Sequence, residues 1–154
     1  MTSIGALRIG PGVPLTTLKD LDQLTTIDRT LRIQGAQITT MDGLNQLSSV
    51  GSIYLAGNQS LYTLEGLENL KQVENDIFIL NNDALTSLEG LYTIESVGGD
   101  LEICLIDFYN IWSGSSQNMV NESLSQADVT NLVKHIGRSN IAGKVIIYQP
   151  YNMD

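Results

Sequence analysis

A regular spacing of apolar residues repeats along the first two thirds of the chain, and it limits the possible fold more than any other feature. Four runs place an apolar residue at every third position. The runs are Leu15, Leu18, Leu21, Leu24, Ile27; Ile38, Met41, Leu44, Leu47, Val50; Leu61, Leu64, Leu67, Leu70, Val73; and Leu85, Leu88, Leu91, Ile94, Val97. The runs and the strand-like pairs beside them recur every 22 to 24 residues. A repeat of this length is typical of a solenoid, because one coil cannot bury its own apolar face and stacked coils can.

Short pairs of alternating apolar residues accompany the runs. The pairs are Leu7/Ile9, Leu31/Ile33, Ile53/Leu55, Ile77/Ile79 and Leu101/Ile103, at intervals of 24, 22, 24 and 24 residues. Alternation with a period of two predicts half-buried strands. A period of three predicts 3-10 or polyproline-like arcs, in which every third side chain returns to the same side. Stacking therefore predicts a parallel sheet on one side and irregular arcs on the other.

Glycines and asparagines recur at equivalent places in the coils. Gly43, Gly66 and Gly90 each precede an apolar residue of an arc, which indicates a position without room for a Cβ or with a positive φ. Asp20 occupies this place in the first coil and favours the second explanation. Asn58 and Asn82 follow their strands at the same distance, and we expect them to bond the backbone of the neighbouring coil.

Two asparagines also lie in glycosylation sequons. Asn58-Gln59-Ser60 is the first, and Asn121-Glu122-Ser123 is the second. Glycosylation is the alternative role for Asn58. In a chain this rich in Asn and Ser, two such triplets are close to the number expected by chance.

The repeat stops at residue 108, and the rest of the chain predicts a cap. Residues 110–121 are polar and are expected to form a loop. Ser125 and Asp128 have the spacing of a capping box, and Gly137 is a natural helix end. Apolar residues at helical spacing lie between them, namely Val129, Leu132, Val133 and Ile136. Residues 144–148 are β-branched and aromatic and predict a last strand.

We therefore expect one domain with two parts. Residues 1–107 form a solenoid of about five coils, and residues 108–154 supply the loop, cap helix and final strand. The solenoid begins almost at the first residue, at Leu7, where no cap is visible. That end needs a cover, such as an upstream segment, another chain or a second copy.

Composition excludes some partners and leaves the location open. The net charge of −9 and pI near 4.3 argue against nucleic acid and against an anionic membrane surface. No apolar stretch has the length of a membrane span, so direct membrane insertion is not expected. The first residues, MTSIGALRIG, do not resemble a signal peptide. A cytoplasmic protein and a segment whose targeting sequence lies elsewhere both remain possible.

The residue types that carry catalysis are scarce. His135 is the single histidine, and Cys104 the single cysteine, so neither a two-histidine metal site nor a disulfide within the chain is available. The spacing of a calcium loop is absent from the acidic residues Asp100, Glu102 and Asp107. We therefore expect them to form a solvated acidic edge. We expect no catalytic, cofactor-binding or metal-binding residues, and no enzymatic activity.

Alternation also predicts which side chains the sheet displays. Residues between the inward-facing pairs point outward, and stacking aligns them in what we call the central row: Arg8, Arg32, Tyr54, Phe78 and Glu102. Beside it runs a second row of Gly10, Gln34, Ala56, Leu80 and Cys104. We expect the central row, with Leu80, to form a binding surface, because exposed aromatic and arginine side chains are favoured at contacts. The alternative is that residues 108–121 fold back and cover it.

The coil resembles a leucine-rich repeat, and in particular the repeat of receptor L domains. The phrase G-L-x-x-L-x-x-V-x-G-x-L-x-I carries the resemblance, and it is present from Leu44 to Leu55, from Leu67 to Ile79 and from Leu91 to Ile103. The cysteine-rich flanks of animal receptors are absent. The resemblance implies a right-handed leucine-rich-repeat α/β solenoid that binds a protein or glycan ligand outside the cell or at its surface. The alternative is a subunit of a coat, fibre, filament or virion that binds copies of itself through its uncapped end or sheet face.

Overall fold

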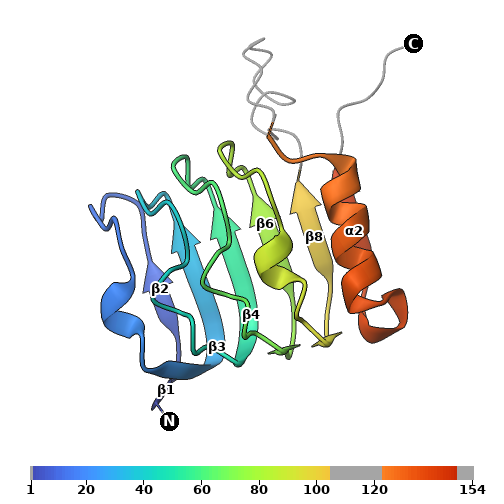
Figure 1. Cartoon of the computed structure of the whole chain (residues 1–154), viewed down its shortest axis with the longest axis horizontal. Helices are drawn as coiled ribbons and strands as arrows, with labels where there is room; N and C mark the ends of the chain where they lie inside the picture. Colours follow the sequence, from blue (N-terminus) through green and yellow to red (C-terminus); the bar gives the residue numbers. More distant parts are fainter. Residues whose placement is uncertain (1, 105–122, 149–154) are drawn as a thin grey trace.

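The chain forms a parallel β-solenoid of about four turns, and an α-helix lies at its C-terminal end (Figure 1). The structure is a computed structural model, and it describes residues 2–104 and 123–148. The five strand pairs expected from the sequence are all strands. They enclose four complete turns, one fewer than the number of coils expected, because a turn is completed only when the next strand is reached.

One nine-stranded parallel sheet contains all of the strands found in the described residues. Its main order is β1-β3-β4-β6-β8-β9, with β2 also paired to β3 and with β5 and β7 paired on one side. The strands are β1 (Thr2–Ile4), β2 (Leu7–Ile9), β3 (Leu24–Gln34), β4 (Ser49–Ala56), β5 (Gln72–Val73), β6 (Ile77–Leu80), β7 (Ser96–Val97), β8 (Leu101–Cys104) and β9 (Val145–Tyr148). The inward pairs stay in register from β2 to β8, and a register shift between Ile27 and Thr30 of β3 accommodates the one interval of 22 residues.

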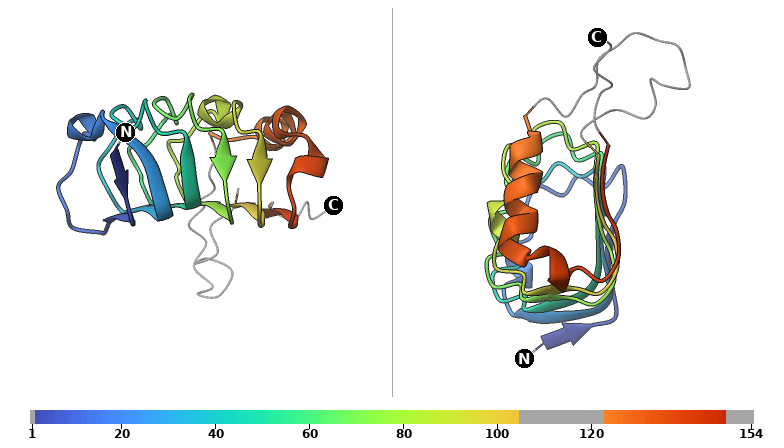
Figure 2. Two further views of the ribbon diagram at one scale, coloured as in Figure 1. Left: turned by 90° about the horizontal axis from the view of Figure 1, so that it is seen from below. Right: turned by 90° about the vertical axis from the view of Figure 1, so that its right-hand side faces the viewer.

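The ends of the apolar runs form a second parallel ladder, which the period of three did not predict. Ile27, Val50, Val73 and Val97 pair in sequence from coil to coil, and Val97 continues to Ile141 through a single bridge. At these positions the chain is already extended, because it is turning from the arc into the next sheet strand. Figure 2 shows the arcs and helices on one side of the stack and the strands on the other.

The core lies between the sheet and the arcs. All residues of the four apolar runs are buried except Leu15 and Leu21, which are half-buried. Both exceptions lie in the first coil, which has a described neighbour on one side only. The same core continues into the cap through Val129, Leu132 and Ile136.

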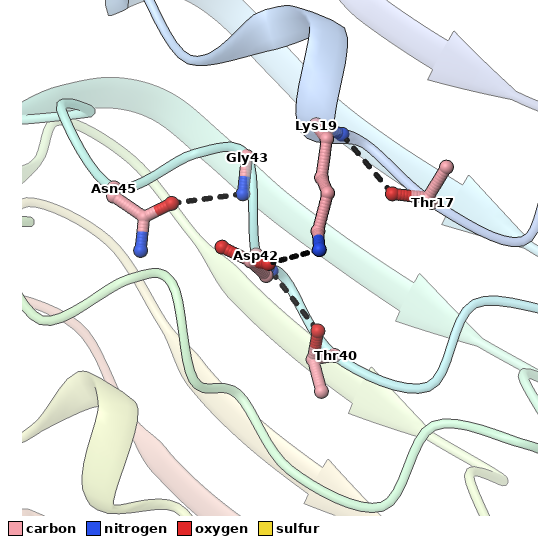
Figure 3. Close-up of polar contacts among 6 residues, drawn as sticks. All are labelled: Thr17, Lys19, Thr40, Asp42, Gly43 and Asn45. Atoms are coloured by element: carbon pink, nitrogen blue, oxygen red, sulfur yellow. Dashed lines mark hydrogen bonds and ion pairs between the residues drawn. The ribbon is translucent and has the colours of Figure 1, made fainter.

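Hydroxyl side chains start the arcs in a repeating way that the apolar pattern does not reveal. Thr17 accepts a hydrogen bond from the backbone N–H of Lys19 (3.2 Å), and Thr40 accepts one from Asp42 (3.2 Å) (Figure 3). Thr63 and Ser87 do the same in the next coils. Two of the arcs then form 3-10 turns, η1 (Lys19–Leu21) and η2 (Glu89–Leu91). These local bonds explain how a chain with a period of three turns so tightly.

The preceding coil leaves no room for a Cβ at any of the three recurrent glycines, and two of them, Gly43 and Gly66, also have a positive φ. The preference for backbone conformation over crowding, drawn from Asp20, was therefore only partly correct. A Cβ at Gly43 would overlap the carbonyl of Leu18, and one at Gly90 would overlap the carbonyl of Leu64. Gly43 also has a φ of +114°, whereas Gly90 has no positive φ. Asp20 is tolerated because no described coil lies against that side of the first arc.

The two buried asparagines tie each coil to the one before it, as predicted. Asn58 accepts a hydrogen bond from the backbone N–H of Ala36 (3.0 Å) and donates one to the carbonyl of Ile33 (3.0 Å). Asn82 accepts from the backbone N–H of Asn58 (3.1 Å) and donates to the carbonyl of Leu55 (3.0 Å). Both side chains are fully buried. Glycosylation of Asn58 is therefore incompatible with this fold, whereas Asn121 lies outside the described residues.

A helix and a strand cover the end of the stack, as the sequence predicted. The helix α2 (Gln126–Ile136) lies on the arc side, and β9 continues the sheet (Figure 2). The N-terminus of α2 has the full capping box of Ser125 and Asp128. Gly137 ends the helix before a 3-10 turn, η3 (Arg138–Asn140). The exposed His135 ring stacks on Tyr92, with centroids 3.9 Å apart. The loop expected at residues 110–121 lies outside the described residues.

Replacing Ser125 with alanine tests how much the capping box contributes. The Ser125 hydroxyl accepts a hydrogen bond from the backbone N–H of Asp128, and the Asp128 carboxylate accepts one from that of Ser125. We expect Ser125→Ala to lower the free energy of unfolding by about 1 kcal/mol, measured by urea denaturation. Ser139→Ala is the matched control on an exposed residue of η3 and should change little. Equal effects of the two changes would contradict a role for the cap.

Candidate functional site

The sheet register aligns the central row and extends it by one residue. Pairing runs from Arg8 to Arg32, Tyr54, Phe78 and Glu102, and then to Ile146 of β9. The second row runs through Gln34, Ala56, Leu80 and Cys104 and gains Tyr148. Both rows face away from the core, except that the small side chains of Ala56 and Cys104 are buried.

Arg32, Tyr54 and Phe78 contact one another through their planar groups. The guanidinium carbon of Arg32 lies 4.6 Å from the centre of the Tyr54 ring, a cation–π contact. The Tyr54 and Phe78 ring centres are 6.2 Å apart, with the planes tilted by 54°. This separation falls in the range of favourable aromatic pairs. The three side chains therefore support one another on the sheet surface while remaining at least partly exposed.

A hollow of about 280 Å³ opens beside these side chains. Its walls include Arg8, Arg32, Thr30, Ser52, Tyr54 and Phe78. Guanidinium groups, hydroxyl groups and aromatic rings thus meet in one small depression. Ligand sites combine apolar surface with polar groups that fix the orientation of the ligand, and both are present here in similar measure.

The two arginines have no acidic partner among the described residues. The ion pairs of that part of the chain join Lys19 to Asp42 (3.5 Å) and Lys71 to Glu95 (3.4 Å), and both lie on the arcs. Arg32 donates a hydrogen bond to Gln34 (2.7 Å), which leaves its charge uncompensated. The hollow is therefore a cationic place on a chain of net charge −9.

The other two predicted site residues do not line the hollow. Glu102 lies beyond Phe78 in the central row, and Leu80 is half-buried in the second row. The charge of Glu102 raises the pKa of the Tyr148 phenol, with burial and a hydrogen bond from that phenol as further causes. Glu102 is therefore engaged with β9, away from the arginines.

Thr30 and Ser52 are members of the site that the sequence reasoning missed. They pair with each other one step before the inward residues Leu31 and Ile53. The same alternation that selected Arg32 and Tyr54 puts these hydroxyls on the outer face. The sequence did contain this signal, because Thr30 and Ser52 lie two residues before Arg32 and Tyr54 and so belong to the same outward-facing alternation.

The described residues hold no group of three or more His, Cys, Asp or Glu side chains placed to bind a metal ion. Cys104 is a buried thiol, and Asp107 lies outside the described residues. Within the same part of the chain, no helix has the length and apolar character needed to cross a membrane.

No family model matches this chain, and searches of curated proteins and of solved structures also find no match. The proposals below therefore depend on the residues and geometry of the chain itself.

Proposed function

We propose that this protein is a non-enzymatic recognition module that binds a protein or glycan ligand through the outward face of its sheet. The proposal includes a right-handed leucine-rich-repeat fold of the receptor L-domain type, and a place outside the cell or at its surface. The parallel solenoid and the repeat phrase from Leu44 to Leu55 support this relationship.

The hollow beside the central row carries the proposal. Arg32, Tyr54 and Phe78 lie on three successive strands and surround a depression of about 280 Å³. Tyrosine and arginine dominate binding energy at contact surfaces when they become buried there. A sheet face that served only as a solvated surface would not need two adjacent aromatic rings.

A structural subunit that assembles with copies of itself is the second candidate. The first coil favours it, because β2 pairs on one edge only within the described residues. Apolar side chains are also incompletely covered there, including Leu7, Leu15 and Leu21, and Val13 is 46% exposed. Open strand edges and uncovered apolar residues are the features that drive end-to-end assembly. Sedimentation velocity at micromolar concentration separates the candidates, since the first predicts a monomer and the second predicts polymers.

Alanine at Tyr54 or Phe78 tests the sheet face directly. Both rings are half-buried, so we expect stability losses near 1 kcal/mol, well below the roughly 3–5 kcal/mol of a core aromatic. We expect each change to weaken binding or assembly by about 2 kcal/mol or more. Thermal melts measure the first quantity, and affinity for binders selected from glycan and peptide panels measures the second.

Tyr62→Ala is the matched control for these truncations. Tyr62 is 50% exposed on an arc, so its removal takes away a similar ring from another surface. It should leave both stability and binding nearly unchanged. Strong destabilisation by Tyr54→Ala and Phe78→Ala would instead show that these rings are part of the core and that the binding face lies elsewhere.

A further inference from the structure

The arginine end of the hollow indicates the charge of the ligand. Arg8 and Arg32 are directly paired on β2 and β3, and neighbouring strands lie only about 4.8 Å apart. Neither guanidinium has a carboxylate within ion-pair distance in the described residues. Two adjacent like charges repel each other, and an anion bound between them offsets this repulsion. Guanidinium groups bind carboxylate and other oxyanions with paired hydrogen bonds.

The remaining walls indicate the chemistry of the group that carries the anion. The hydroxyls of Thr30 and Ser52 line the hollow and make no hydrogen bond with any residue in the part of the chain that the structure describes. Tyr54 and Phe78 supply apolar ring surface beside them. A sugar ring has hydroxyl groups around its edge and apolar C–H groups on its faces, so it matches both kinds of wall.

Size and position favour a sugar over a peptide. The hollow of about 280 Å³ is just below the roughly 300 Å³ at which ligand sites usually begin, so it accommodates a single small unit. A peptide strand binds to a free sheet edge, and a peptide helix needs a long apolar groove. Arg32, Tyr54 and Phe78 lie on β3, β4 and β6, which are paired on both sides, so most of the hollow lies away from the open edge of β2, the strand that carries Arg8.

We infer that the hollow binds one anionic sugar unit, with its carboxylate or sulfate between Arg8 and Arg32 and its ring against Tyr54 and Phe78. Glu102 lies beyond Phe78 in the central row, on the side away from the arginines, and disfavours the opposite orientation by repulsion. This inference rests on the proposed recognition function, because it assigns the ligand of the same sheet face.

Titration of the full chain with defined oligosaccharides tests the inference. The probes are glucuronate-containing and sulfated oligosaccharides, with the methyl ester of the former as a neutral analogue. We expect saturable binding of an anionic probe by calorimetry, and little binding of the neutral analogue. Comparison of the two anionic probes shows whether carboxylate or sulfate is preferred.

Charge removal at the arginines is the second part of the test. Arg32→Gln and Arg8→Gln should each weaken binding about tenfold or more, since a hydrogen bond to a charged group is lost. Arg29→Gln removes the same charge from a side chain that lies against Gly5 and does not line the hollow. It should leave the affinity within about twofold, because exposed charges at a distance are screened by salt.

The possible results separate this inference from the function on which it rests. Absence of sugar binding, together with an acidic peptide whose affinity falls with Tyr54→Ala, would overturn the sugar assignment and retain the sheet face as the binding surface. Sugar binding that is insensitive to both Arg32→Gln and Tyr54→Ala would overturn both. Equal weakening by Arg29→Gln and Arg32→Gln would also overturn the site, since it would indicate a general charge effect.

Discussion

Leu67→Asp is expected to unfold the chain. Leu67 is fully buried in the third apolar run, between coils that cover it on both sides. A carboxylate at this position would lie in the core without a partner, and burying an unpaired charge costs at least several kcal/mol. Such a loss is comparable with the total stability of a typical domain, which is about 5–15 kcal/mol. Circular dichroism should therefore show no cooperative thermal transition.

A surface aspartate provides the control for this experiment. Gln46 is exposed on the preceding arc, and Gln46→Asp introduces the same charge there. The control should melt within a few degrees of the unmodified chain, because surface substitutions usually change stability by less than about 0.5 kcal/mol. A cooperative melt of Leu67→Asp at the temperature of the control would contradict the inward orientation of the run, and with it the fold.

Asn58→Leu is expected to give the second largest loss of stability. The substitution keeps the approximate size of the side chain and removes its hydrogen bonds. The backbone N–H of Ala36 would then be buried without its acceptor, and the carbonyl of Ile33 would lose one donor. A buried group left without a partner costs about 1–3 kcal/mol, so the expected loss in the free energy of unfolding is at least that amount, measured by urea denaturation.

Asn69→Leu is the matched control for the buried asparagine. The Asn69 amide also donates to a carbonyl of the preceding coil, that of Asn45 (2.7 Å), but Asn69 is exposed. Water replaces the lost partner there, so the loss should stay below about 1 kcal/mol. If Asn58→Leu cost no more than Asn69→Leu, the asparagine ladder would be unimportant and apolar stacking alone would hold the coils together.

Much of the architecture was predictable because the repeat makes the same local choice several times. The alternation of Leu31 and Ile33 and its equivalents predicted the sheet strands and the face on which Arg32 and Tyr54 lie. The capping box at Ser125 predicted where α2 begins. These signals are short-range, since periodicity and capping depend on neighbours within one or two turns of chain.

Contacts between coils account for what the sequence reasoning missed or misjudged. Asp20 suggested that Gly43 served for its backbone conformation, whereas the carbonyl of Leu18 in the preceding coil also excludes a side chain there. Thr30 and Ser52 become part of a site only because adjacent strands bring them together with Arg8. The position of a residue in the sequence does not by itself show which residue of the neighbouring coil it contacts.

The sequence by itself determined the repeat length, the inward and outward sides of each strand and the presence of a cap, because each follows from spacing along one chain. Only the tertiary structure decided how the displayed side chains combine. It placed the Arg32 guanidinium over the Tyr54 ring and opened a hollow beside them, while it turned Glu102 toward Tyr148. The physical reason is that alternation along one strand shows only which side chains point outward. The shape of the surface that they form depends on the strand register and on side-chain packing between neighbouring coils.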